Sequence, residues 1–256
     1  MKSSIKNILR SLAEASGLEV RKTSVYSSPK LRHRLLFDQL QIDLVVDVGA
    51  NTGQFAHQCR AAGYKGEIIS FEPSAAAHAS LLQSAEADPL WNVAERMALG
   101  AAEGKIEINI AANSYSSSIL PMLDSHLSAA PASQYLHKEK VPIRRLDNVL
   151  VPAARNIFLK LDVQGYESQV LAGATQLLAH TLAVQLEMSL LPLYEGETLM
   201  PQMHAAMTAK GFDLWDLEPS FRDPATGRLL QIDAIFTRSS SDPTTQVNPG
   251  ILPLIQ

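Results

Sequence analysis

Four acidic residues in this chain each end an apolar run, and together they point to one shared site. Asp47, Glu72, Asp162 and Glu187 end runs that are typical of buried strands. The carboxyl ends of parallel strands lie at one edge of a sheet, so we expect the four carboxylates to surround one crevice. Buried carboxylates are costly unless they are paired, which favours a polar or cationic ligand there. The alternative is that each acid caps the helix that follows it.

The turn after Asp47 has the composition of a cofactor-binding loop. Residues 49–53 read Gly-Ala-Asn-Thr-Gly, and a helical pattern begins near Gln54. The two glycines allow a tight turn and let a ligand approach the backbone without a Cβ in the way. A second run, residues 68–71, ends in Glu72, whose carboxylate can accept both ribose hydroxyls of a nucleoside. The pattern therefore predicts a nucleoside cofactor over this turn.

These two segments resemble the cofactor motifs of a known superfamily. Asp-Val-Gly-Ala-Asn-x-Gly at residues 47–53 and Phe-Glu-Pro at residues 71–73 are similar to class I S-adenosylmethionine (SAM) methyltransferases, and more narrowly to their FkbM-type branch. The resemblance implies a Rossmann-like α/β fold: a seven-stranded, mostly parallel sheet with a C-terminal antiparallel strand pair and helices on both faces. It also implies that SAM donates a methyl group to a hydroxyl oxygen of a sugar, glycolipid or polyketide-type acceptor.

The resemblance assigns individual residues to the site. Residues 97–100 match the segment that lies against the adenine in relatives, and the serines at 116–118 match a hydroxyl-rich segment. Asp162 and Glu187 are the expected catalytic residues, and Gln164 departs from the acid that relatives often carry at its position. The expected cofactor-binding residues are Asp47, Gly49, Ala50, Asn51, Gly53, Glu72, Pro73, Ser74, Ala98, Ser117 and Asp162.

Methyl transfer to an alcohol needs a group that takes the hydroxyl proton. An alcohol has a pKa near that of water, roughly 15.7, and a positioned carboxylate can contribute about 10²–10⁴-fold as a base. Asp162 is the first choice, because the turn after the fourth strand faces both cofactor and acceptor in similar enzymes. A nearby sulfonium would make Asp162 a weaker base. A divalent metal held by Asp162 and Glu187 is a less favoured alternative, since it would acidify the hydroxyl directly.

The remaining pattern supplies the elements that must position these residues. Helices are expected after Gln54, over residues 74–86 and over residues 200–210, and the last two strands should pair antiparallel. Residues 111–140 break the αβ rhythm, so we expect a long serine-rich loop that covers the site as a lid, or else a flexible loop without contacts. Further strands are expected at residues 91–99, 105–110, 141–147, 156–162, 181–187, 212–216 and 229–236.

Length and pattern predict one methyltransferase domain with short extensions. The 256 residues fit a single core. We expect an N-terminal helical extension over residues 1–40, the domain over residues 41–238 and a flexible tail over residues 239–256. The apolar face of the first helix is formed by Ile5, Ile8, Leu9 and Leu12. We expect this face to pack on its own domain or on a second copy in a homodimer, with peripheral membrane contact as the alternative.

Composition excludes several classes of protein. A formal net charge of −4 at pH 7 gives no general attraction for nucleic acid. The single cysteine, Cys59, rules out an internal disulfide framework and agrees with a cytoplasmic location. No apolar stretch reaches the roughly 20 residues that a transmembrane helix needs, and the N-terminus lacks the apolar core of a signal peptide.

Other functions share parts of this pattern. A nicotinamide-dependent dehydrogenase would share the turn and the ribose-binding acid, but it needs a tighter Gly-x-Gly turn. A nucleic-acid methyltransferase usually carries prolines and an aromatic residue after the fourth strand to hold a flipped base, and residues 162–165 lack them. A methyltransferase acting on nitrogen and a non-catalytic SAM-binding protein stay open as alternatives.

Overall fold

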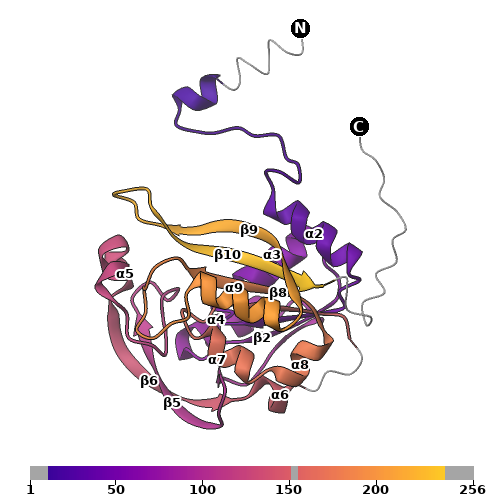
Figure 1. Cartoon of the computed structure of the whole chain (residues 1–256), viewed down its shortest axis with the longest axis vertical. Helices are drawn as coiled ribbons and strands as arrows, with labels where there is room; N and C mark the ends of the chain where they lie inside the picture. Colours follow the sequence, from indigo (N-terminus) through magenta and orange to yellow (C-terminus); the bar gives the residue numbers. More distant parts are fainter. Residues whose placement is uncertain (1–10, 151–154, 240–256) are drawn as a thin grey trace.

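The computed structural model describes residues 11–150 and 155–239. Their centre is a seven-stranded sheet with the strand order β3-β2-β1-β7-β8-β10-β9 (Figure 1). The first five strands run parallel, whereas β10 pairs antiparallel with both β8 and β9. The strands are β1 (Leu44–Val48), β2 (Glu67–Phe71), β3 (Trp91–Val93), β7 (Ile157–Leu161), β8 (Thr181–Ser189), β9 (Phe212–Arg222) and β10 (Leu229–Arg238). The predicted seven-stranded, mostly parallel sheet with its antiparallel pair is confirmed.

Helices cover both faces of this sheet, which is why its central strands are buried throughout. Every residue of β1 and β7 is buried. One face packs on α2 (Pro29–Gln39), α3 (Gln54–Ala62) and α4 (Ala75–Ala85) through residues such as Leu36, Phe55 and Leu81. The other face packs on α6 (Leu146–Val149), α7 (Glu167–Ala172), α8 (Thr175–His180) and α9 (Met200–Ala209). Two such layers fix the carboxyl edge of the sheet rigidly.

A second, three-stranded sheet corrects two of the expectations. Its order is β4-β6-β5, with β4 (Ala98–Leu99), β5 (Gly104–Ala111) and β6 (Tyr135–Arg144). The strand expected over residues 91–99 is therefore two short strands, β3 and β4, that belong to different sheets. The strand expected over residues 141–147 begins earlier and ends at Arg144, as part of β6.

The loop expected over residues 111–140 is also corrected. It contains α5 (Asp124–Ala129), a 3₁₀ turn at Pro131–Ser133 and the first half of β6. The sequence hides β6 because most of its side chains from Tyr135 to Lys140 are exposed, so no apolar alternation marks the strand. Its backbone pairs antiparallel with β5, and the apolar contacts of the small sheet come from residues such as Ile108 and Val141.

The extensions lie partly outside the described residues. Of the predicted N-terminal apolar face, only Leu12 is described, and it is 61% exposed in a helical segment that includes residues 11–15. The helix α2 lies within the expected helical extension over residues 1–40. The predicted tail lies outside the described residues, apart from Ser239. No helix within residues 11–150 and 155–239 is long and apolar enough to cross a membrane.

Candidate functional site

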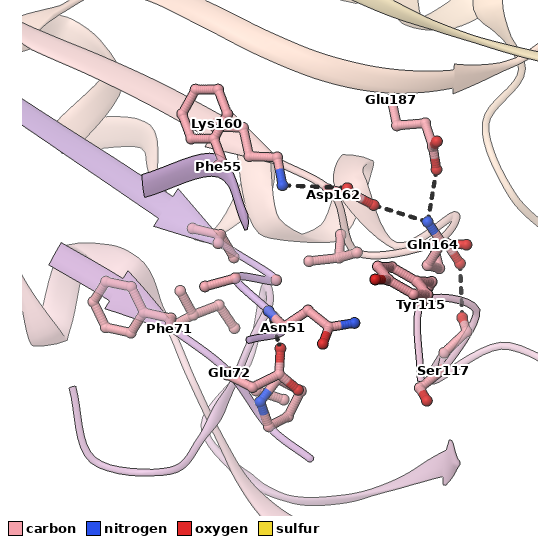
Figure 2. A pocket seen from close by; sticks show the side chains of 18 of the residues that line it. Asn51, Phe55, Phe71, Glu72, Tyr115, Ser117, Lys160, Asp162, Gln164 and Glu187 are labelled. Carbon is pink, nitrogen blue, oxygen red and sulfur yellow. Dashed lines mark hydrogen bonds and ion pairs between the residues drawn. The ribbon is translucent and has the colours of Figure 1, made fainter. Parts of the chain in front are cut away.

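A cavity of about 300 Å³ opens at the carboxyl edge of the large sheet, between the ends of β1, β2, β7 and β8. The strand order reverses between β1 and β7, and open α/β sheets bind ligands at such a point. Loops of the small sheet close the opposite side of the cavity. Figure 2 shows the polar residues that point into it. The expected site residues that line the cavity are Gly49, Ala50, Asn51, Glu72, Pro73, Ala98, Ser117, Asp162 and Glu187.

The glycine turn joins two strand ends directly. Gly49 has a φ of +77°, which non-glycine residues rarely adopt. A Cβ there would lie 1.9 Å from the backbone oxygen of Asp162. Gly53, with a φ of +96°, would place a Cβ 2.5 Å from the Trp91 ring. Gly53 is the N-cap residue of α3 and is buried away from the cavity. Both glycines therefore permit the tight turn that the sequence predicts and close packing within the protein, and Gly49 also lines the cavity.

Glu72 is held in place by the backbone of two neighbouring turns. It is 6% exposed, and its two carboxylate oxygens accept hydrogen bonds from the amides of Asn51 and Ser74, each at 2.8 Å. Burial raises the pKa of Glu72 to about 7, although the two amide hydrogen bonds oppose this change. Ser74 is buried and contributes its amide to this arrangement rather than lining the cavity. A carboxylate with two such bonds keeps lone pairs that can accept hydroxyls from a ligand.

Asp47 lies inside the sheet and does not line the cavity. It is fully buried, with Lys160 Nζ 3.6 Å from its Oδ1 and Ser70 donating to its Oδ2 at 3.5 Å. Lys160 also donates to Asp162 Oδ2 at 3.2 Å. Although burial lowers the pKa of Lys160, the carboxylates of Asp162 and Asp47 raise it above the ordinary value, so the ammonium stays charged. Asp47 thus pairs with Lys160 inside the sheet. The sequence analysis expected Asp47 to contact the cofactor instead.

Lys160 was missed by the sequence analysis, although one signal was present. A lysine inside the otherwise apolar run of β7 is unusual, because burial of an unpaired ammonium is costly. In the structure the Lys160 ammonium pairs with the carboxylates of Asp47 and Asp162, and Lys160 lines the cavity. The turn that follows β7 is fixed by Glu167, whose Oε1 accepts from the amides of Val163 and Gly165.

Gln164 connects the two expected catalytic carboxylates. Its Nε2 donates to Asp162 Oδ1 at 2.8 Å and to Glu187 Oε2 at 2.7 Å, while Tyr194 donates its hydroxyl to Gln164 Oε1 at 2.6 Å. Burial, followed by the nearby Asp162 and Asp233 carboxylates, raises the pKa of Glu187 well above its ordinary value. The side chain of Asp162 is 34% exposed toward the cavity. The structure therefore brings together the two acids that the sequence predicted, through an amide that it did not assign.

The serine-rich segment lies over the cavity and is well bonded. Ser118 donates to the backbone oxygen of Gln164 at 2.7 Å, and Ser117 accepts from the amide of Ala111 at 3.0 Å. Asn51 donates to Ser114 at 3.3 Å, which joins the segment to the glycine turn. These contacts exclude the alternative of a flexible loop without contacts. That the segment opens and closes as a lid stays a prediction.

The two ends of the cavity differ in chemistry. One end is apolar, with Phe71, Leu99 and Ile108 among its lining residues, whereas the other carries the carboxylates of Asp162, Glu187 and Asp233. Lys160 is the only cationic side chain that lines the cavity within the described residues. Such a cavity suits a ligand with a flat apolar ring, ribose hydroxyls for Glu72 and a positively charged group. Residues 11–150 and 155–239 contain no cluster of three or more His, Cys, Asp or Glu side chains that could hold a metal ion.

One family model and several solved structures are similar to this chain. The family model described as the methyltransferase FkbM domain matches residues 47–214. None of the curated proteins matches the chain. Among solved structures, a proposed RNA methyltransferase of Pyrococcus horikoshii is 12% identical, with 87% of this chain and 90% of that chain covered and a TM-score of 0.45. A SAM-dependent methyltransferase of Aquifex aeolicus is also 12% identical, with 82% and 94% covered and a TM-score of 0.39.

Proposed function

The chain belongs to the FkbM methyltransferase domain family, and from this premise we propose that it transfers a methyl group from SAM to a hydroxyl oxygen of a sugar, glycolipid or polyketide-type acceptor. The observation that carries the proposal is the pair of carboxylates, Asp162 and Glu187, that faces the cavity at its polar end. Either one is placed to take a proton from a hydroxyl, which a reaction at an alcohol requires.

The cavity fits SAM in three respects. Glu72 would accept the ribose hydroxyls, and the apolar wall near Ala98 and Leu99 would contact the adenine. The turn from Gly49 to Asn51 has small side chains at its first two positions, which leave room for the methionine part of the cofactor. The carboxylate of Asp162 would attract the positive charges of the sulfonium and the ammonium. When bound, SAM supplies a methyl group whose bond to sulfur breaks with its electron pair left on sulfur.

The chain's own residues supply alignment and proton removal. The rigid edge formed by β1 and β7 holds cofactor and acceptor in line, which can provide much of the rate. The bond from the acceptor oxygen to the methyl carbon forms as the hydroxyl proton passes to a carboxylate of the site. Lys160 stays paired with Asp47 and Asp162, so it keeps the Asp162 carboxylate close to the cavity.

The affinity for SAM is expected to rise with pH through the titration of Glu72. The ionised carboxylate accepts both ribose hydroxyls, so SAM binding favours the charged form and releases a proton below the pKa of about 7. Calorimetry should give an affinity about tenfold lower at pH 6 than at pH 8. In Glu72→Gln, which cannot ionise, this pH dependence should disappear. If SAM affinity depended on pH equally in the wild type and the variant, Glu72 would not belong to the ribose site.

Nitrogen and nucleic-acid acceptors are the competing proposals. A formal net charge of −4 and an acidic cavity both disfavour a phosphate backbone. The decisive experiment is incubation of the purified chain with methyl-labelled SAM and a panel of sugars, glycolipids, polyketide alcohols, amines and RNA. We expect label in base-stable ethers of hydroxyl compounds. Label in amines or RNA alone would overturn the hydroxyl assignment, and SAM binding without any transfer would favour a non-catalytic SAM-binding protein.

The other partner expectations stay proposals. We propose a cytoplasmic protein whose acceptor is a small molecule or a lipid-linked glycan, with the N-terminal helix packed on the domain or on a second copy. Contact of this helix with a membrane surface remains the alternative.

A further inference from the structure

The amide of Gln164 has one orientation in which all of its bonds can form. The Asp162 carboxylate, paired with the Lys160 ammonium, only accepts hydrogen bonds, so the NH₂ group must face Asp162, and the same nitrogen then reaches Glu187. The oxygen then faces the hydroxyl of Tyr194, which is fully buried. Burial raises the pKa of Tyr194, so the hydroxyl keeps its proton and donates it to the amide oxygen. Tyr194 therefore fixes which way the amide points.

The carboxylates of Asp162 and Glu187 differ in the hydrogen bonds that they accept. Both oxygens of Asp162 already accept a strong donor, since Lys160 bonds Oδ2 and Gln164 bonds Oδ1. Glu187 receives its short bonds on Oε2, from Gln164 at 2.7 Å and from Gln231 at 3.0 Å. Among the described residues, its Oε1 accepts only a long bond of 3.4 Å from Ser220. Glu187 thus retains an oxygen that can take a proton, whereas Asp162 is tied to a cation.

We propose that Gln164, oriented by Tyr194, is a positioning residue that sets Glu187 as the proton acceptor and keeps Asp162 as the anion that faces the cationic cofactor. The assignment rests on the proposed function. In the reaction, the hydroxyl proton of the acceptor moves to Glu187, while Asp162 keeps its ion pair with Lys160. The sequence analysis favoured Asp162 as the base, because it could not see that each of its oxygens already accepts a donor and that one of these donors is the Lys160 ammonium.

The test is the titration of Glu187, followed by carbon-13 NMR of side-chain carboxyl groups in the full chain labelled at glutamate. Glu187→Gln identifies the signal. In Gln164→Met, which is similar in length but has no donor, the Glu187 carboxylate loses a short hydrogen bond and the balance shifts toward its protonated form. We expect the titration midpoint to rise by about one pH unit or more. Tyr194→Phe should move the midpoint in the same direction by a smaller amount, because the amide can then rotate.

Tyr135→Phe is the matched control. Tyr135 is a partly buried tyrosine near the site, and it donates to the backbone oxygen of Leu120 and not to Gln164. Its replacement should leave the Glu187 midpoint unchanged. A midpoint that stays at the wild-type value in Gln164→Met, or that moves equally in Tyr194→Phe and Tyr135→Phe, would overturn the positioning role.

Calorimetry with SAM on the same samples separates this inference from the proposed function. The wild type should bind SAM, and Gln164→Met should keep most of that affinity, because Asp162 keeps its charge and its ion pair with Lys160 in this variant. Failure of the wild type to bind SAM would overturn the proposed function whatever the Glu187 midpoint does. Normal SAM binding with an unmoved midpoint would overturn only the role of Gln164.

Discussion

Gly49→Ala is expected to destabilise the fold by about 2–5 kcal/mol, the sum of left-handed backbone strain and overpacking. The added Cβ would meet the backbone oxygen of Asp162 at 1.9 Å. Neither backbone can move away without separating the ends of β1 and β7, because every residue of these paired strands is buried. Any shift that relieves the clash would also displace the turn that carries Asp162, so SAM affinity should fall by more than tenfold. Denaturant unfolding and calorimetry measure the two effects.

Gly63→Ala is the matched control for this prediction. Gly63 also has a positive φ, of +95°, but a Cβ there meets nothing within 4 Å. It should cost only the strain of the left-handed conformation, about 1–2 kcal/mol, with SAM affinity unchanged. If both variants lost the same stability, the contact between the two strand ends would not be what requires glycine at position 49.

Glu187→Gln and Asp162→Asn are expected to lower turnover by different routes. Glu187→Gln removes the proton acceptor, so turnover should fall by about 10²–10⁴-fold while SAM affinity changes little. Asp162→Asn removes a negative charge that faces the cationic cofactor and pairs with Lys160, so turnover and SAM affinity should fall together. Turnover is measured with the hydroxyl acceptor found in the labelled-methyl screen, and SAM affinity by calorimetry on the same preparation.

Asp43→Asn controls for the loss of a negative charge as such. Asp43 pairs with Arg155 at the opposite edge of the sheet, and its replacement should leave both quantities at the wild-type level. Normal turnover in Glu187→Gln, together with a loss of turnover but not of affinity in Asp162→Asn, would return the role of base to Asp162.

The parts of the fold that the sequence predicted correctly are those with one dominant signal. The central strands are apolar on both faces, because helices cover both, so β1 and β7 could be placed to within a residue or two. The acids at the strand ends were predicted to meet because parallel strands share an edge, and three of the four, Glu72, Asp162 and Glu187, line one cavity. The exception, Asp47, is fully buried inside the sheet and faces Lys160.

The parts that were missed depend on contacts between distant segments. β6 is mostly exposed and is held by pairing with β5, so its own residues carry little strand pattern. The break between β3 and β4 is set by the two sheets to which these strands belong. The sequence analysis noted Gln164 only as a departure from the acid of relatives and did not assign Tyr194. Their roles follow from a hydrogen bond that joins them across 30 positions. Only the folded chain shows such an arrangement.

The central claim is that the cavity at the ends of β1, β2 and β7 binds SAM, and calorimetry of the wild type with SAM and with NAD tests it most directly. Glu72→Ala is the informative variant, because it removes the acceptor for the ribose hydroxyls. Charge-assisted hydrogen bonds contribute about 1.5–3 kcal/mol, so its SAM affinity should fall by tenfold or more with the fold intact. We predict SAM binding by the wild type, no binding of NAD and this loss in the variant. Binding of NAD in preference to SAM, or an unchanged SAM affinity in folded Glu72→Ala, would contradict the account.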